Sequence, residues 1–205
     1  AKGAFPSSFS YGNDAVETVS YDPDGAKKLL EESGWTDTDG DGYVDKDGQK
    51  LSINWLTYPT RLEQPKLAEY AQATLKDIGI DVVVNNTSDH MTIAKSGDFD
   101  VYVSSTTTAP TGDPEYFFTS TVTGAKNYGK YQNEEVTKLT DQLHQTFDKD
   151  ERAKLAVELQ QDILDDDAFF FVSHLNMGIV TKSNVTGMAA HPCDYYELTA
   201  DLDIN

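Results

Sequence analysis

The sequence is poor in cysteine, in basic residues and in long apolar runs. Its single cysteine, Cys193, has no partner for an internal disulfide, and no CxxC pair exists for a metal or redox site. Lys and Arg number 16 against 35 Asp and Glu, which gives a net charge of −19. A chain of that charge repels phosphate backbones, so we expect no nucleic-acid partner. No stretch approaches the roughly 20 apolar residues that cross a bilayer.

Motifs of the common enzyme classes are also missing. The chain has no GxSxG, no HExxH and no glycine-rich phosphate loop. The four histidines, His90, His144, His174 and His191, lack the spacing of a helical metal pair, so a three-histidine site would require convergence in the fold. Each histidine taken singly is better interpreted as a structural or solvated residue. We therefore predict that the protein is not an enzyme.

What remains is the composition of a folded protein. Hydrophobic residues make up 38% and aromatic residues 11% of the 205 residues. They recur along the whole length, which excludes a disordered tail. The first residues lack the apolar stretch of a signal peptide and do not resemble a natural start, so we expect a piece of something longer. No repeat or linker divides the chain, and we predict one layered domain over residues 1–205.

Helix and strand patterns alternate in the first half of the chain. Asp22 with Pro23 is typical of a helix start, and Gly34 of its end. Short connections between the later segments imply right-handed parallel crossovers. The expected segments are a strand at 51–58, a helix from Pro65 to Ile78, a strand at 80–84, a helix at 89–96 and a strand at 99–104.

The second half is more helical. Asp113 with Pro114 opens a short helix, and a longer helix at 134–147 places Val136, Leu139, Leu143 and Phe147 on one face. Asp148 is the predicted cap of the next helix. Residues 168–173 read as an apolar strand, with 177–181 as its antiparallel continuation. The predicted fold class is mixed α/β, a mainly parallel sheet flanked by helices, with a C-terminal tail.

The sharpest local motif is the acidic loop DTDGDGYVDKDG at 37–48. Alternate carboxylates on a tight turn offer the oxygen ligands that calcium prefers. Gly48 stands where an EF-hand has its bidentate Glu, and a strand follows, so the loop is not an EF-hand. The alternative is an Asp/Gly-rich turn whose carboxylates cap backbone amides. A structural calcium ion would take its ligands from Asp37, Asp39, Asp41, Tyr43 (through its carbonyl) and Asp45.

A long polar loop at 105–112 follows the last predicted strand of the first half. Ligands of parallel sheets bind beyond the carboxyl ends of the strands, and hydroxyl, amide and aromatic groups gather here. Composition by itself favours an ordinary surface loop, and a ligand site is the alternative. The candidate ligand-binding residues are Thr107, Thr111, Tyr116 and Asn127.

Six stretches together carry a family resemblance. They are YDPDGAKKLLEESGW (21–35), DTDGDGYVDKDG (37–48), LKDIGIDV (75–82), GDFDVYVSS (97–105), GDPEYFF (112–118) and the helical pair at 131–166. In this order they resemble the C-terminal lobe of the family 5 solute-binding proteins of bacterial peptide, nickel and opine ABC importers. The tail at 173–205 is most similar to Gram-positive proteins described as nickel-binding.

The resemblance implies one lobe of a two-lobe, periplasmic-binding-protein-like clamp. Ligand binds between the lobes, hinge closure buries it, and the closed form docks on ABC permease subunits. No cofactor is required. The expected location is outside the cytoplasmic membrane, at the cell surface or in the periplasm, as a lipoprotein whose anchor is absent from this chain. Residues from about 175 to 205 are expected to pack on the missing lobe.

The resemblance also bears on the cargo. In peptide-binding relatives an aspartate before the Asp-Pro helix pairs with the amino terminus of the peptide, and the corresponding position here is Pro110. The A-P-x-x-D-P loop is similar to that of Gram-negative nickel binders, although their Trp corresponds to Thr107 and their nickel-binding His falls near Asn127. Neutral donors such as Thr111 and Tyr116 suit a chelate whose charge is already balanced.

The predicted cargo is therefore nickel or a nickel chelate, captured without covalent chemistry. An oligopeptide or dipeptide is the alternative within the same family. A metal-dependent hydrolase domain and a calcium-stabilised scaffold module are the alternatives from other classes.

Overall fold

Two compact units make up the chain. One is formed by Ser20–Ser105, and the other by Ala1–Val19 together with Thr106–Asn205. The computed structural model describes residues 1–176, 178–189 and 199–205. Within those residues no helix combines the length and the apolar character needed to cross a membrane.

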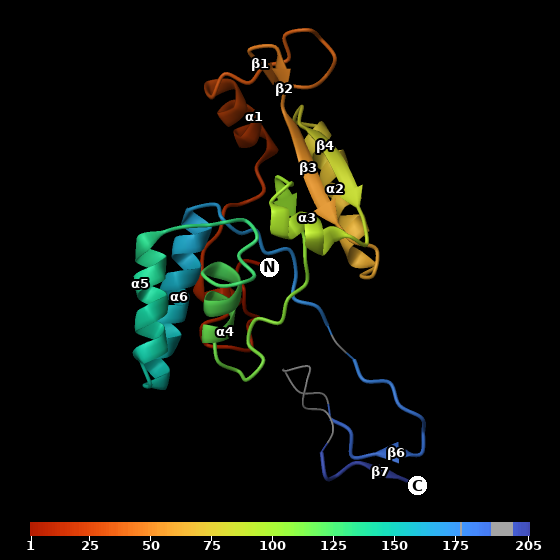
Figure 1. Ribbon diagram of the computed structural model, residues 1–205, viewed down its shortest axis with the longest axis vertical. Helices are drawn as coiled ribbons and strands as arrows, with labels where there is room; N and C mark the ends of the chain where they lie inside the picture. Colours follow the sequence, from red (N-terminus) through yellow and green to blue (C-terminus); the bar gives the residue numbers. More distant parts are fainter. Residues whose placement is uncertain (177, 190–198) are drawn as a thin grey trace. The chain divides into compact units, whose positions relative to one another are not determined.

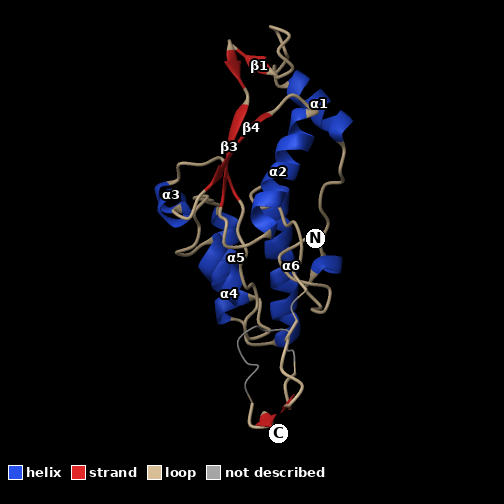
Figure 2. Ribbon diagram, turned by 90° about the vertical axis from the view of Figure 1, so that its right-hand side faces the viewer, coloured by secondary structure: helices blue, strands red, loops and turns tan. Residues whose placement is uncertain are grey.

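A three-stranded parallel sheet forms the centre of the Ser20–Ser105 unit. β3 (Ser52–Thr57) lies between β4 (Asp81–Asn86) and β5 (Val101–Tyr102) and pairs in parallel with both. The connections are α2 (Glu63–Lys76), which packs against β3 and β4, and α3 (His90–Ser96) (Figures 1 and 2). The predicted parallel strands with helical connections are confirmed.

Two further elements precede this sheet. α1 (Pro23–Glu32) begins as predicted, because the Asp22 carboxylate accepts a hydrogen bond from the backbone N–H of Gly25 at 2.9 Å. β1 (Asp45–Lys46) and β2 (Gln49–Lys50) form a short antiparallel hairpin after the acidic loop.

The start of α2 differs from the prediction. The helix begins at Glu63, two residues before Pro65, and its N-cap Leu62 makes no capping hydrogen bond through its side chain. Pro65 therefore lies within the first turn. Backbone N–H groups there make no hydrogen bond within the helix, so a proline costs none.

Helices dominate the other unit. η1 (Asn13–Ala15) is a short 3-10 turn, and α4 (Glu115–Phe117) continues into the π-helical turn η2 (Phe118–Val122). α5 (Glu134–Gln145) and α6 (Lys149–Asp165) then lie side by side (Figure 1). Asp148 caps α6 as predicted, through hydrogen bonds from the N–H groups of Asp150 and Glu151. β6 (Val185–Thr186) and β7 (Asp203–Ile204) form an antiparallel pair.

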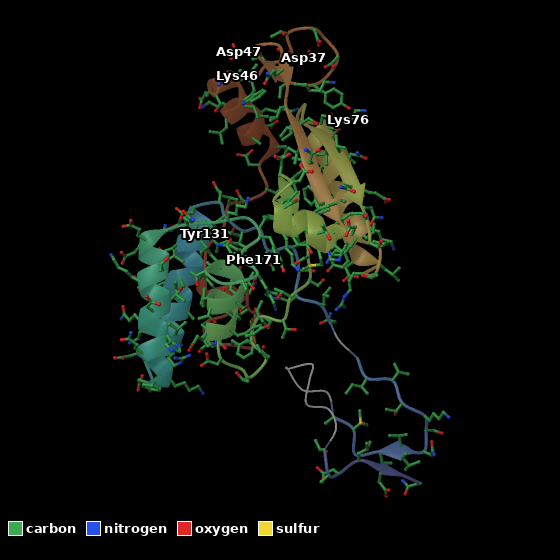
Figure 3. All side chains as sticks on the ribbon, in the orientation of Figure 1. Asp37, Lys46, Asp47, Lys76, Tyr131 and Phe171 are labelled. Atoms are coloured by element: carbon green, nitrogen blue, oxygen red, sulfur yellow. The ribbon has the colours of Figure 1, made fainter. Side chains whose placement is uncertain are left out.

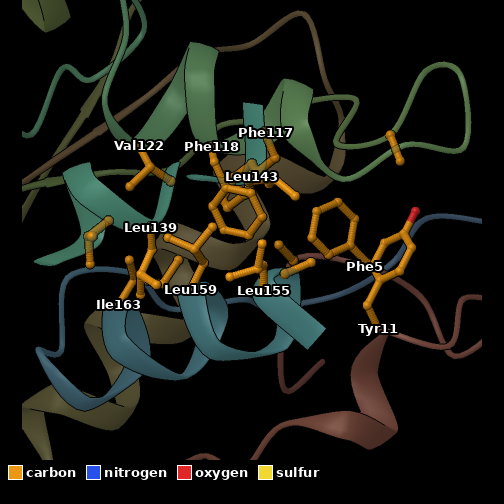
Figure 4. Packing of buried hydrophobic residues seen from close by; sticks show 14 residues of the cluster. Phe5, Tyr11, Phe117, Phe118, Val122, Leu139, Leu143, Leu155, Leu159 and Ile163 are labelled. Atoms are coloured by element: carbon orange, nitrogen blue, oxygen red, sulfur yellow. The ribbon is translucent and has the colours of Figure 1, made fainter. Parts of the chain in front are cut away.

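The apolar faces of these helices close on the N-terminal arm. Phe5 is fully buried, and its ring lies 5.9 Å from that of Phe118, between centroids (Figure 4). Val136, Leu139 and Leu143 face this core as predicted. Phe147 was predicted on the same face and this is wrong: α5 ends at Gln145, and the Phe147 side chain is 91% exposed.

The strand predicted at 168–173 is also wrong. This segment has no strand partner among the described residues, and neither does 178–181, while residue 177 lies outside them. The apolar alternation is nevertheless meaningful. Phe169 and Phe171 pack on the helical core, and Phe170 between them is 79% exposed. The extended chain buries one face against helices, which produces a strand-like pattern without a sheet.

Truncating the buried ring of Phe118 should be costly. We expect Phe118→Ala to lower the free energy of unfolding by about 3–5 kcal/mol, because it leaves a cavity in a packed core. Phe170→Ala, which removes the same atoms from an exposed site, should change it by less than about 0.5 kcal/mol. Urea unfolding followed by circular dichroism measures both. Equal losses in the two variants would contradict the assigned core.

Candidate functional site

A hollow of about 760 Å³ opens in the helical unit. Its walls come from the N-terminal arm, the loop before α4, α4 itself, and the turn between α5 and α6. Thr111 and Tyr116, two of the predicted ligand-binding residues, line it, whereas Thr107 and Asn127 do not. The structure thus brings together half of the predicted set.

Hydrogen bonds distinguish these predicted residues further. The Asn127 amide closes a turn, because its Nδ2 donates to the carbonyl of Tyr131 at 2.8 Å and its Oδ1 accepts from the Tyr131 N–H at 2.9 Å. The hydroxyl of Tyr116 accepts from Nζ of Lys126 at 2.9 Å, while its ring is 39% exposed. Tyr116 and Thr111 can contact a ligand as they stand, and Asn127 would first have to leave its turn.

Arg152 is the charged centre of the hollow, and sequence analysis missed it. Its Nε and Nη2 donate to the two oxygens of Asp113 at 3.0 and 2.7 Å, and Nη2 also reaches Glu115 at 2.8 Å. Its Nη1 donates to the carbonyls of Leu143 and Thr146, each at 2.6 Å. The guanidinium therefore joins α4, α5 and α6. No local motif signals it, because Asp113 lies 39 residues away in the sequence.

Two groups beside Arg152 have shifted acidities. Burial alone would raise the pKa of the Glu115 carboxyl, but hydrogen bonds with His144 and Arg152 outweigh burial, and the pKa lies below its usual value. The His144 contact joins Nδ1 to Oε1 at 2.6 Å. Burial, followed by the negative charge of Asp113, raises the pKa of the Tyr11 hydroxyl, which donates to the carbonyl of Gly112 at 2.7 Å. Tyr11 therefore stays protonated at neutral pH.

The depressed pKa of Glu115 predicts an acid-sensitive contribution to stability. That contribution is fully present above the unfolded pKa of about 4.3 and is lost as the pH falls through the lower folded value. Glu115→Gln should therefore lose less stability between neutral pH and about pH 3 than the wild type loses. Urea unfolding at a series of pH values tests this, and parallel curves for the two proteins would contradict it.

The acidic loop brings three carboxylates together. Oxygens of Asp37, Asp39 and Asp45 lie within 4.8 Å of one another in the loop where Figure 3 labels Asp37. The same carboxylates also bind backbone: Asp37 accepts from the N–H groups of Gly40 and Gly42 at 2.7 and 3.0 Å. The capping interpretation therefore describes what Asp37 does in the structure.

Asp41 and Tyr43 are engaged by a lysine. Nζ of Lys50 lies 2.8 Å from an oxygen of Asp41 and 4.2 Å from the centre of the Tyr43 ring. The hydrogen bond from Lys50 lowers the pKa of Asp41. Of the predicted calcium ligands, Asp37, Asp39 and Asp45 converge, and the carboxylate of Asp41 is directed to Lys50.

Bound calcium stays a prediction that a melting experiment can test. Calcium at 100 times its dissociation constant would raise the free energy of unfolding by about 2.7 kcal/mol. Asp39→Asn should reduce the rise in melting temperature, whereas Asp47→Asn, in the same loop but outside the cluster, should preserve it. If calcium leaves the wild-type melting temperature unchanged, the loop is a capped turn only.

Comparisons with known proteins connect these units to one family. A family model described as "Bacterial extracellular solute-binding proteins, family 5 Middle" matches residues 1–129. The oligopeptide-binding protein AppA of Bacillus subtilis is 30% identical over 193 residues, which cover 91% of this chain and 36% of AppA. The nickel-binding periplasmic protein of Escherichia coli is 26% identical over 197 residues, which cover 92% of this chain and 37% of that protein.

A solved structure supports the same relationship. The crystal structure described as a nickel ABC transporter from Bacillus halodurans matches with a TM-score of 0.68 and 30% identity, covering 82% of this chain and 35% of that one. This likeness confirms the predicted mixed α/β class with a parallel sheet flanked by helices. The chain spans little more than a third of the length of the curated relatives it matches.

Proposed function

The chain belongs to family 5 of the bacterial extracellular solute-binding proteins, and we propose that it is the C-terminal lobe of the substrate-binding component of an ABC importer. The complete protein captures nickel or a nickel chelate outside the cytoplasmic membrane and delivers it to the permease subunits. It acts at the cell surface or in the periplasm, tethered by a lipid anchor carried elsewhere in the protein. The importer role is supported by relatives that are named as binding proteins.

Transport by such a protein depends on closure of two lobes around the cargo. A ligand can favour the closed form only by binding it more tightly than the open form. Contacts from both lobes supply that difference, so this lobe needs few donors of its own. Binding and release then follow from a shift in population, and no covalent step is involved.

The engagement of Asp113 is the observation that favours a metal chelate over a peptide. Residues 103–112 contain no charged side chain, so Asp113 is the first acid after the sheet. Arg152 occupies both of its carboxylate oxygens. A peptide amino terminus would need an unpaired carboxylate in this segment. A chelate whose charges are already balanced needs only neutral donors, such as the hydroxyl of Thr111.

Oligopeptide binding is the second candidate. It is favoured by AppA, which matches at 30% identity across 91% of this chain, a higher identity than that of the Escherichia coli nickel-binding protein. In that case the carboxylate for the amino terminus would come from outside residues 103–112.

Calorimetric titration of the complete two-lobe protein separates the candidates. We expect heat and a fixed stoichiometry with nickel, or with nickel in excess histidine, and no heat with a dipeptide mixture. Thr111→Val should weaken binding of the chelate by roughly 2–10-fold, the effect of one lost hydrogen bond. Thr123→Val, outside the hollow, is the matched control. Heat with peptides alone would preserve the importer role and overturn the cargo.

A further inference from the structure

Three ring side chains meet at the carboxyl edge of the parallel sheet. Tyr58 directly follows β3, His90 is the first residue of α3 after β4, and Tyr102 ends β5. They come from three strand ends that are distant in the sequence. The carboxyl edge is where ligands of open parallel sheets bind, because the loops that follow neighbouring strands converge there.

The imidazole of His90 is held on two sides. Its ring stacks on the ring of Tyr58, with centroids 4.1 Å apart and an interplanar angle of 18°. Its Nδ1 lies 2.8 Å from the hydroxyl of Tyr102. Tyr58 is itself fixed, because it is 8% exposed and its hydroxyl accepts from the N–H of Ser105 at 3.2 Å. The orientation of the His90 ring is therefore set before any ligand arrives.

One tautomer of His90 carries its proton on Nδ1. In it Nδ1–H donates to the hydroxyl oxygen of Tyr102, whose own proton can point toward the sulfur of Met91, 3.9 Å away. In that tautomer Nε2 holds a lone pair. Among the described residues no group forms a hydrogen bond with Nε2 of His90, which is half-buried.

We propose that Nε2 of His90 coordinates the metal ion of the cargo, an inference that rests on the proposed function. Imidazole nitrogen is a good ligand for nickel. Metal-binding histidines commonly donate the N–H of their other ring nitrogen to a neighbouring oxygen, and the Tyr102 hydroxyl, 2.8 Å from Nδ1 of His90, is such a partner. The ring is already ordered by Tyr58, so coordination costs little side-chain entropy. One protein nitrogen is enough for a divalent transition metal whose other positions are filled by a small chelator.

The other described histidines differ in their surroundings. His144 binds Glu115 through Nδ1 and is 72% exposed on a helix surface. His174 binds the carbonyl of Gly3 through Nε2 at 2.9 Å. In the part of the chain that the structure describes, neither histidine lies at a strand end or stacks on another ring. His174 therefore offers a matched control for a histidine substitution.

The test is nickel binding by the complete two-lobe protein carrying His90→Gln. Titration with nickel chloride in a buffer free of chelator should show an affinity at least roughly tenfold below that of the wild type, the lower end of the loss caused by disturbing a metal's ligand shell. His174→Gln should retain the wild-type affinity. Melting temperatures measured without metal show whether each variant is folded.

X-ray absorption of the bound nickel supplies a second readout. With nickel chloride every imidazole around the metal belongs to the protein, so the wild type should show one more imidazole than His90→Gln. If His90→Gln fails to fold, His90→Asn replaces it. A wild-type spectrum that shows no imidazole bound to nickel overturns the inference. Nickel binding that His90→Gln leaves unchanged overturns the role of His90 and preserves the cargo. A wild type that binds neither nickel nor its histidine chelate overturns the proposed function itself.

Discussion

A single guanidinium, that of Arg152, satisfies the polar groups at the point where α4, α5 and α6 meet. It binds two carbonyls at the end of α5 and the carboxylates of Asp113 and Glu115. Without it these groups would lose their partners while partly shielded from water, which is energetically costly. The same bonds engage both carboxylates that could otherwise bind a cationic ligand. One ion cluster thus joins three helices and engages two of the acids that line the hollow beside them.

The other unit depends on the register of its parallel sheet. Ser52 pairs with Asp81 and Trp55 with both Val84 and Val101, so the three strands present their carboxyl ends on one edge. Residues that follow those ends become neighbours whatever their separation in the sequence. This geometry creates the contact between Tyr58 and His90, and with it an ordered imidazole at the edge where a ligand is expected.

The aspartates of the acidic loop fit both a capped turn and a cation site. Closely spaced aspartates satisfy the amides of a tight turn and also offer the oxygen atoms of a cation site. Asp37 accepts hydrogen bonds from the N–H groups of Gly40 and Gly42. Asp41 forms an ion pair with Lys50 and does not join the carboxylate cluster of Asp37, Asp39 and Asp45. Lys50 reaches Asp41 from β2, beyond the Asp-rich part of the motif, so the spacing of the aspartates could not reveal this competition.

Local structure and family membership were determined by the sequence itself. The caps at Asp22 and Asp148, the alternation of strand and helix patterns, and the apolar stripe that contains Val136 and Leu143 all follow from residues a few positions apart. Of the four candidate ligand residues, Thr111 and Tyr116 line the hollow.

Only the tertiary structure decided the rest. Phe169 and Phe171 pack on helices, although their alternation had suggested a sheet. Asp113 forms an ion pair with Arg152. The ring of His90 stacks on Tyr58 and contacts the hydroxyl of Tyr102. Each outcome depends on a partner contributed by a distant part of the chain. Such pairings depend on how the whole unit packs, so a local sequence pattern cannot predict them.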